Sequence, residues 1–251
     1  MYWQFINMAS GSHLKVSTGL RSCTMDVTAT DPFLVKDQKV VLLDTPGFDN
    51  TNASDFDILE EIARYMTKTY VSSSLLISSA NREIRYKKRR LLDGILYFHN
   101  IVDNVMGAKA QRNLRVFQSL CGNESLKAVV VVTNMWGLIP NMDLGVAREK
   151  ELAEDPVFFG QLLRNGAGLR RHTGTRESSH EILSSLLFKG DKQEVLNIQT
   201  EIVDRKLLLE QTSAAVELIK EFDSIIRNLV CPVRLFFDHR RQKLDWLPQA
   251  R

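Results

Sequence analysis

Cysteine is scarce in this chain of 251 residues, and its three copies (Cys23, Cys121 and Cys231) stand far apart. They form no Cys-x-x-Cys pair and no Cys/His cluster with metal-ligand spacing, so the sequence predicts neither a disulfide framework nor a zinc site. This cysteine usage is typical of a reducing cellular compartment, and we expect a cytoplasmic protein.

Long apolar runs are missing as well. There is no apolar core of a signal peptide near the start and no run long enough to cross a bilayer, so we expect no transmembrane segment. The net charge of +3 is too small to indicate nucleic-acid binding by itself. The one dense basic run, residues 85–90, is better explained as a solvated loop or translated non-coding sequence than as a nucleic-acid or lipid site. We therefore expect no nucleic-acid partner.

The most informative stretch is residues 39–47, an apolar, β-branched run that ends in Asp-Thr-Pro-Gly. Such a run predicts a buried strand. In an open α/β sheet, ligands bind outside the carboxyl ends of the strands. There Asp44 could hold Mg²⁺ through water, and Gly47 could donate its backbone N–H to a terminal phosphate. The alternative is a strand that ends in a plain Thr-Pro-Gly turn and needs no ligand.

Further strands and helices alternate along the chain. Apolar runs predict strands at residues 94–99 and 128–136, and residues 166–172 lead into another strand. Helical periodicity predicts helices over residues 55–69, 109–121, 144–153 and 177–187. Apolar runs separated by helices are typical of a parallel sheet covered on both faces. With 44% hydrophobic and 25% charged residues, the composition suits such a globular α/β domain.

With strand, Asp-Thr-Pro-Gly, helix, strand, helix and a strand ending in Thr-Asn-Met-Trp in this order, residues 4–187 resemble a P-loop GTPase domain. More narrowly, the chain is similar to the septin-like and AIG1-like GTPases in their fungal single-domain form. Matching pieces also occur at residues 5–7, 18–24 and 148–149. The resemblance implies a three-layer P-loop NTPase-like fold, GTP/GDP and Mg²⁺ as cofactors, and a family that hydrolyses GTP.

The resemblance also implies roles by position. It places Asp44, Gly47 and the intervening Thr45 on the phosphate side, with Asp44 as a Mg²⁺ residue. Thr24 would be the first-switch threonine that coordinates Mg²⁺, although a solvated hydroxyl is the alternative and Ser22 lies close by. On the base side, the resemblance implies contacts from the following two residues: Thr133 and Asn134.

The chain departs from the family pattern at its start. The loop Gly-x-x-x-x-Gly-Lys-Ser/Thr, whose backbone N–H groups and lysine cradle the phosphates, is absent, and Tyr2 and Trp3 stand in place of its lysine and serine. The strand before that loop would also be absent. The two strands on either side of it would then have to pair with each other, or another segment would have to take its place. We expect the sequence to be incomplete at its start, and nucleotide binding by the chain to be weakened or lost.

The base loop differs too, because Trp136 stands where an aspartate would accept from guanine N1–H and the N2 amine. Trp136 could stack on the base or simply pack. A preference for GTP over ATP is therefore implied by the resemblance alone. After Gly47 comes Phe48 and not a water-positioning glutamine, and we interpret His99 as a structural residue outside the site.

The predicted organisation is a G domain over residues 1–190 with an insertion or translated intron at 71–90, a long amphipathic helix over 191–230, and an irregular basic tail over 231–251. The helix approximates a heptad seam that Arg205 and other polar residues interrupt, so we expect it to dock on the G domain or to mediate self-association or binding of a protein partner. The leading interpretation is a GTP-binding protein with slow hydrolysis. The alternative is a pseudo-GTPase, an interaction module without nucleotide chemistry, and whether the chain is an enzyme stays open.

Overall fold

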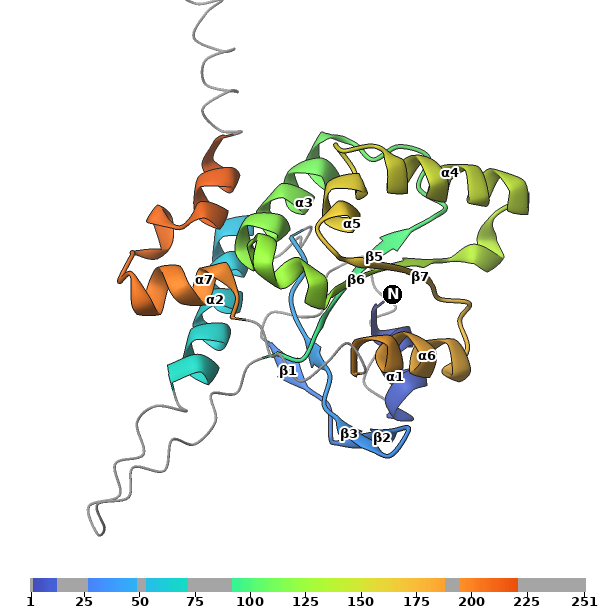
Figure 1. The fold of residues 1–251 in the computed structure, drawn as a ribbon, viewed down its shortest axis with the longest axis horizontal. Coiled ribbons are helices and arrows are strands. Elements are labelled where there is room, and N and C mark those ends of the chain that lie inside the picture. Colours follow the sequence, from blue (N-terminus) through green and yellow to red (C-terminus); the bar gives the residue numbers. More distant parts are fainter. Residues whose placement is uncertain (1, 13–26, 49–52, 72–91, 188–194, 221–251) are drawn as a thin grey trace, which may run out of the picture.

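The computed structural model describes residues 2–12, 27–48, 53–71, 92–187 and 195–220, and its centre is a parallel sheet of three strands (Figure 1). The strands lie in the order β5 (Ile95–Asn100), β6 (Val129–Asn134) and β7 (Gly168–Arg171). Both neighbouring pairs are parallel. The strands predicted at 94–99 and 128–136 are thus confirmed as β5 and β6, although β6 ends at Asn134, and the strand that residues 166–172 were expected to lead into is β7, which lies within that segment.

Strand β6 is buried at every position because it lies between two strands and between two layers of helices. Its side chains alternate between the faces, as the pleat of a strand requires. Val129 and Val131 pack into one core, and Val130 and Val132 pack into the other. The first core holds residues of α3 (Ala108–Cys121), α4 (Met142–Glu154) and α5 (Gly160–Arg164), and the second holds residues of α1 (Tyr2–Ser10) and α6 (Arg176–Leu187). The predicted α/β arrangement with helices on both faces is therefore confirmed.

The helical predictions agree with the structure to within a few residues. The helix expected at 55–69 is α2 (Asp55–Val71), and its predicted apolar face is buried at Ile58, Leu59, Ile62, Ala63 and Met66. It begins with a reciprocal cap, in which the Ser54 N–H donates to Asp57 Oδ2 at 3.0 Å and the Asp57 N–H donates to Ser54 Oγ at 3.1 Å. Helices α3, α4 and α6 correspond to the other three predictions.

The apolar run at residues 39–43 does not form the buried strand of the parallel sheet that the sequence predicts. This segment belongs to two short antiparallel pairs and not to the parallel sheet. Its first part is β3 (Gln38–Val40), paired with β2 (Phe33–Val35), and its second part is β4 (Leu43–Asp44), paired with β1 (Thr28–Ala29). Val41, between the two parts, is 48% exposed, so the apolar run is not the strand buried on both faces that its composition predicts.

The β2–β3 hairpin explains this difference. Its two-residue turn, Lys36 and Asp37, has positive φ at both positions (45° and 65°), which is the conformation of the type I′ turn that matches the twist of two antiparallel strands. The hairpin brings Val35 and Val40 into the core beneath α6, where both are buried. The pairing therefore stabilises residues 38–40 locally.

The C-terminal segment is not the continuous helix predicted for residues 191–230. Over its described residues, α7 (Asn197–Gln199) continues into a π-helical turn η3 (Thr200–Asp204), the chain then leaves the helical path, and η4 (Leu209–Gln211) precedes a helix at 213–220. Lys206 in the break has a φ of 59°, which no right-handed helix contains. Residues 221–230, the insertion at 72–90 and the tail at 231–251 lie outside the described residues.

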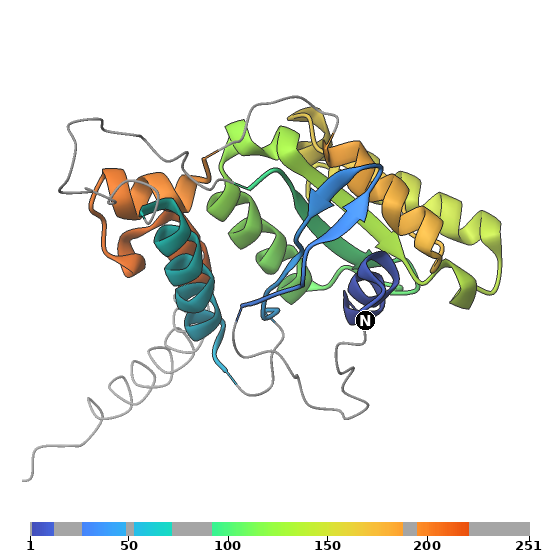
Figure 2. The ribbon, with the colours of Figure 1, turned by 90° about the horizontal axis from the view of Figure 1, so that it is seen from below.

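This C-terminal segment packs against α2 and α3, as both ribbon views show (Figure 2). Gln199 is 1% exposed, and its Nε2 donates to the carbonyl oxygen of Met66 in α2 at 3.0 Å. The Tyr70 hydroxyl donates to Asp204 Oδ2 at 3.1 Å. Over the part of the chain that the structure describes, no helix has the length and apolar character needed to span a bilayer.

Candidate functional site

Polar side chains gather where the three parallel strands end. Asn100 ends β5, Thr133 and Asn134 end β6, and Arg171 ends β7. The carboxyl ends of parallel strands meet at one edge of the sheet, which is the usual position of ligand sites in open α/β folds. We therefore take this edge as the candidate site.

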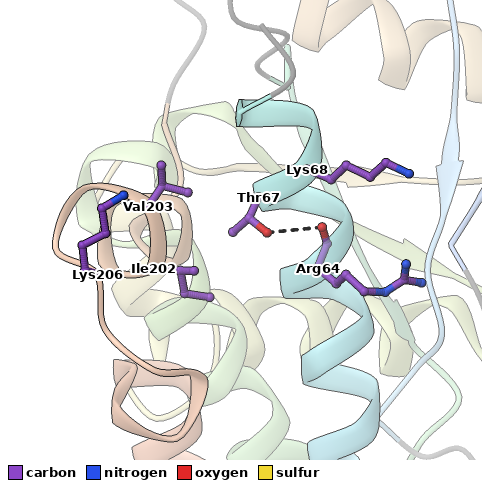
Figure 3. A pocket seen from close by; sticks show the side chains of 6 residues that line it. All are labelled: Arg64, Thr67, Lys68, Ile202, Val203 and Lys206. Carbon is purple, nitrogen blue, oxygen red and sulfur yellow. Dashed lines mark hydrogen bonds between the residues drawn. The ribbon is translucent and has the colours of Figure 1, made fainter. Parts of the chain in front are cut away.

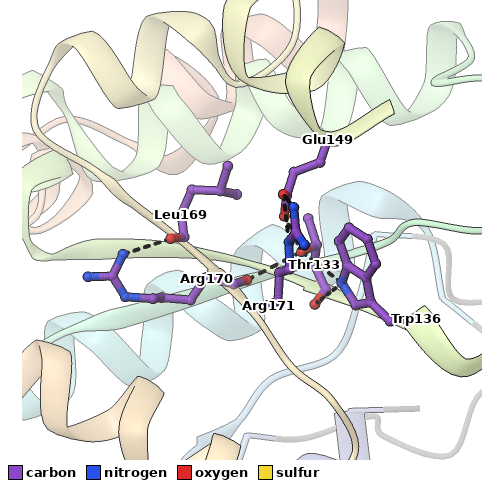
Figure 4. Close-up of polar contacts among 6 residues, drawn as sticks. All are labelled: Thr133, Trp136, Glu149, Leu169, Arg170 and Arg171. Carbon is purple, nitrogen blue, oxygen red and sulfur yellow. Dashed lines mark hydrogen bonds and ion pairs between the residues drawn. The ribbon is translucent and has the colours of Figure 1, made fainter. Parts of the chain in front are cut away.

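Thr133 is fully buried, and its polar atoms contact neighbouring residues of the protein (Figure 4). Its hydroxyl donates to Glu149 Oε1 on α4 at 3.0 Å. Its carbonyl oxygen accepts from the His172 N–H at 2.8 Å and from Trp136 Nε1 at 3.2 Å, and the same indole nitrogen lies 3.1 Å from the hydroxyl oxygen. Thr133 thus joins β6 to α4, to the end of β7 and to η2 (Trp136–Leu138).

Glu149, Arg171 and Trp136 complete this cluster. Glu149 Oε2 accepts from Arg171 Nε at 2.7 Å, and the Arg171 guanidinium carbon lies 4.2 Å from the centroid of the Trp136 ring. A cation over an indole face is an attractive arrangement. Trp136 is 6% exposed, and its edge lies so close to α4 that a Cβ on Gly145 would be 2.9 Å from Trp136 Cζ3. Of the two roles considered for Trp136, the structure has it packed within the protein.

Helix α4 also holds the loop that follows β5. Arg148 Nη1 donates to the carbonyl oxygens of Ile101 and Val102 at 3.1 and 3.2 Å. Because Arg148 and Glu149 are adjacent, one turn of α4 fixes both the loop after β5 and the ends of β6 and β7. The sequence pointed to this pair only through the resemblance, and its contacts could not be predicted from the sequence.

Asn134 faces the opposite side of the sheet. It has the same strand parity as Val130 and Val132, which pack against α1 and α6. Its side chain is 6% exposed, and its Oδ1 is buried without a hydrogen-bond partner among the described residues. Its backbone carbonyl, in contrast, accepts from the Ile101 N–H at 3.1 Å. A buried acceptor left unpaired costs about 1–3 kcal/mol, so this atom is the least satisfied feature of the edge.

The first turn of α1 lies beside the same edge. The Phe5 ring contacts Phe98 near the end of β5 and His172 just after β7, each edge to face with centroids 5.0 Å apart. His172 Nδ1 is 2.8 Å from Ser178 Oγ, and burial lowers the pKa of its imidazole. These aromatic rings surround the end of the sheet on the Asn134 side.

His99 lies on the other face of β5 and has a structural environment. Its ring meets Phe159 edge to face at 5.4 Å. Burial lowers the pKa of His99, and the nearby Asp103 carboxylate opposes that shift in part. These contacts are those of a side chain packed within the protein.

Of the predicted phosphate-side residues, Asp44 lies on a different sheet from the predicted base-side residues, and Thr45 and Gly47 follow it outside the strands. Asp44 ends β4, is 7% exposed and pairs with Thr28 of β1. Thr45 and Gly47 are exposed, and the space where a Gly47 side chain would begin is open. Thr24 and Ser22 lie outside the described residues. Within the described ranges there is no group of three or more His, Cys, Asp or Glu side chains arranged to hold a metal ion.

A hollow of about 410 Å³ lies elsewhere, between α2 and the η3 region (Figure 3). The Thr67 hydroxyl there donates to the Arg64 carbonyl at 3.2 Å, and the charged ends of Arg64 and Lys68 extend away from Ile202 in the close-up. Because its polar groups do not converge on one point, this hollow is a weaker candidate for a ligand site than the carboxyl edge of the sheet.

No protein-family model and no curated protein matches this chain. The resemblance to P-loop GTPases therefore stays a prediction. The features of the edge that the sequence did not reveal are Asn100, which lies one residue beyond the predicted strand, and the cluster around Arg171. A register count between the predicted strands could have placed Asn100 beside Asn134, whereas the contacts of Arg171 depend on how α4 packs.

Proposed function

We propose that the chain is a nucleotide-binding domain of the P-loop GTPase class, in which nucleotide binding is weakened. The observation that carries this proposal is the buried, unpartnered Oδ1 of Asn134 at the carboxyl edge of a parallel sheet. Such an edge is where α/β folds bind ligands, and an unpaired buried acceptor is a group that a ligand N–H donor would satisfy.

Asn134 and Thr133 are proposed as the base side of this site. The first turn of α1 lies beside the same edge, and the free N–H groups of a helix amino end favour an anion. Asp44, Thr45 and Gly47 are proposed for the phosphate side, and Thr24 with Asp44 for Mg²⁺. With no phosphate loop in the sequence, these groups supply only part of the charge that a triphosphate needs, which is why we propose weak binding and slow hydrolysis.

A pseudo-GTPase that serves as an interaction module is the second candidate, and a separate observation favours it. The polar atoms of Thr133, Glu149 and Arg171 bond to one another, and Arg171 covers the Trp136 ring, so this half of the edge is satisfied without a ligand. In such a module the partner, or a second copy of the chain, would bind through residues 192–230. Two apolar side chains of that segment, Val216 and Ile219, are 42% and 40% exposed one helical turn apart.

The test is equilibrium binding of a fluorescent GTP analogue to the full chain, with and without Mg²⁺, and with unlabelled GTP and ATP as competitors. We expect weak binding that GTP displaces and that Mg²⁺ strengthens. Asp44→Asn should remove the Mg²⁺ dependence, whereas Asp37→Asn, at an exposed hairpin position where Asn tolerates the positive φ, should leave it intact. Absence of binding by the folded chain would reject the nucleotide proposal and favour the interaction module.

A further inference from the structure

Two asparagine side chains lie next to each other at the carboxyl edge. Asn100, the last residue of β5, is in direct register with Asn134, the last residue of β6. Residues paired across parallel strands point to the same face of the sheet. Leu96 and Phe98, which share the parity of Asn100, pack into the core beneath α1 and α6, and so place both carboxamides on that face.

Neither carboxamide is engaged by the described part of the protein. Asn100 accepts one hydrogen bond, from the Asp103 N–H at 3.2 Å, and does so through its backbone carbonyl. Asn134 Oδ1 is buried without a partner. A carboxamide offers one acceptor and two donors, and its two ends exchange places by rotation about one bond, so the pair can present an acceptor and a donor to the same ligand.

The surroundings narrow the chemistry of that ligand. An unpaired carbonyl oxygen attracts N–H donors and repels phosphate oxygens, and one amide oxygen is too few for a hard metal ion. The rings of Phe5, Phe98 and His172 pack edge to face beside this face, so the surroundings of the acceptor are aromatic and largely apolar. A purine with an exocyclic amino group combines a flat ring with N–H donors at its edge.

We propose that Asn134 and Asn100 form the specificity pair of the base site. In this pair, Asn134 Oδ1 accepts from the exocyclic amine of guanine, and the Asn100 carboxamide hydrogen-bonds to the polar edge of the base next to that amine. This inference rests on the proposed nucleotide binding and assigns a residue, Asn100, that the sequence resemblance does not. It also supplies a neutral acceptor where Trp136 provides none.

The experiment compares GTP with ITP, which lacks only the exocyclic amine, as competitors for the fluorescent analogue on the full chain. A hydrogen bond from an otherwise unpaired acceptor predicts that GTP binds about tenfold more tightly than ITP. Asn134→Leu should bring the two affinities to within about twofold, whereas Asn100→Leu removes a contact to an edge that GTP and ITP share, so it should weaken both nucleotides and keep their ratio. Asn165→Leu, an exposed asparagine just before β7 at the opposite edge, is the matched control and should preserve the tenfold ratio.

Each outcome decides between the two proposals. If wild-type protein binds both nucleotides equally, or if Asn134→Leu keeps the tenfold ratio, the specificity pair is wrong while the proposed function stands. If neither nucleotide binds to the folded wild-type chain, both proposals fail together. Asn134→Ala, with its fold checked by circular dichroism, replaces Asn134→Leu if the leucine variant does not fold, and the same loss of ratio is expected.

Discussion

Replacing Asn134 by leucine should stabilise the protein or leave its stability unchanged, although the residue is only 6% exposed. The reason is that the side chain makes no hydrogen bond within the described structure, so that nothing is lost on removing its polar atoms. Relieving a buried, unpaired acceptor returns about 1–3 kcal/mol, and a near-isosteric change of shape costs less than about 1.5 kcal/mol. We expect a net gain of about 0–2 kcal/mol in the free energy of unfolding.

The matched control is Gln199→Met, which removes a buried carboxamide that is fully used. Gln199 Oε1 accepts from the Leu196 N–H at 2.9 Å, and its Nε2 donates to Met66. Losing both bonds should cost about 2–4 kcal/mol. Urea unfolding followed by far-UV circular dichroism measures both variants. A loss of 1 kcal/mol or more in Asn134→Leu would show that Asn134 has a donor in the protein, and the argument for a ligand at this atom would then fail.

Three further predictions concern the surroundings of the site. Glu149→Ala should destabilise the protein by about 1–3 kcal/mol, because it removes the acceptor shared by β6 and β7, while Glu154→Ala on the exposed side of α4 should cost under about 0.5 kcal/mol in the same urea titration. Gly145→Ala should cost about 1 kcal/mol or more in thermal unfolding, because the new methyl group meets two side chains at under 3 Å, whereas Gly137→Ala enters open space and should be neutral. Since burial lowers the folded-state pKa of His172 below its usual 6.5, the unfolded chain binds more protons on acidification, and stability should fall as the pH drops through 6.5. His172→Gln should flatten that fall, and an unchanged pH profile would contradict the assigned burial effect.

The sequence predicted the layered part of the fold well, because periodicity there reflects burial directly. Four valines in a row can only be covered on both faces, and β6 is so covered. The apolar run at residues 40–43 looked the same but belongs to two antiparallel pairs. Its actual pairing depends on a turn at Lys36 and Asp37, where Asp tolerates a positive φ but Lys rarely adopts one, so that the pair is a weak turn signal in the sequence.

The candidate site was predicted in part. Asn134 was identified through the family resemblance, and the structure adds the reason for interest in it, which is an acceptor without a partner. The neighbourhood of Thr133 was not foreseen, because its contacts come from α4 and β7, far away in the sequence. The break at residues 205–208 was also missed, since a helical pattern of apolar residues continues across it while Lys206 takes a left-handed conformation.

The central position of β6 has a consequence for handling this protein. Residues 129–134 form a six-residue, charge-free segment dominated by β-branched side chains, which is the composition of segments that stack into cross-β assemblies. In the native state both edges and both faces of this strand are covered, so the segment can aggregate only when the domain unfolds. Refolding yield should therefore fall as protein concentration rises, and a lysine placed at Val130 would suppress aggregation only by sacrificing the core that hides the segment.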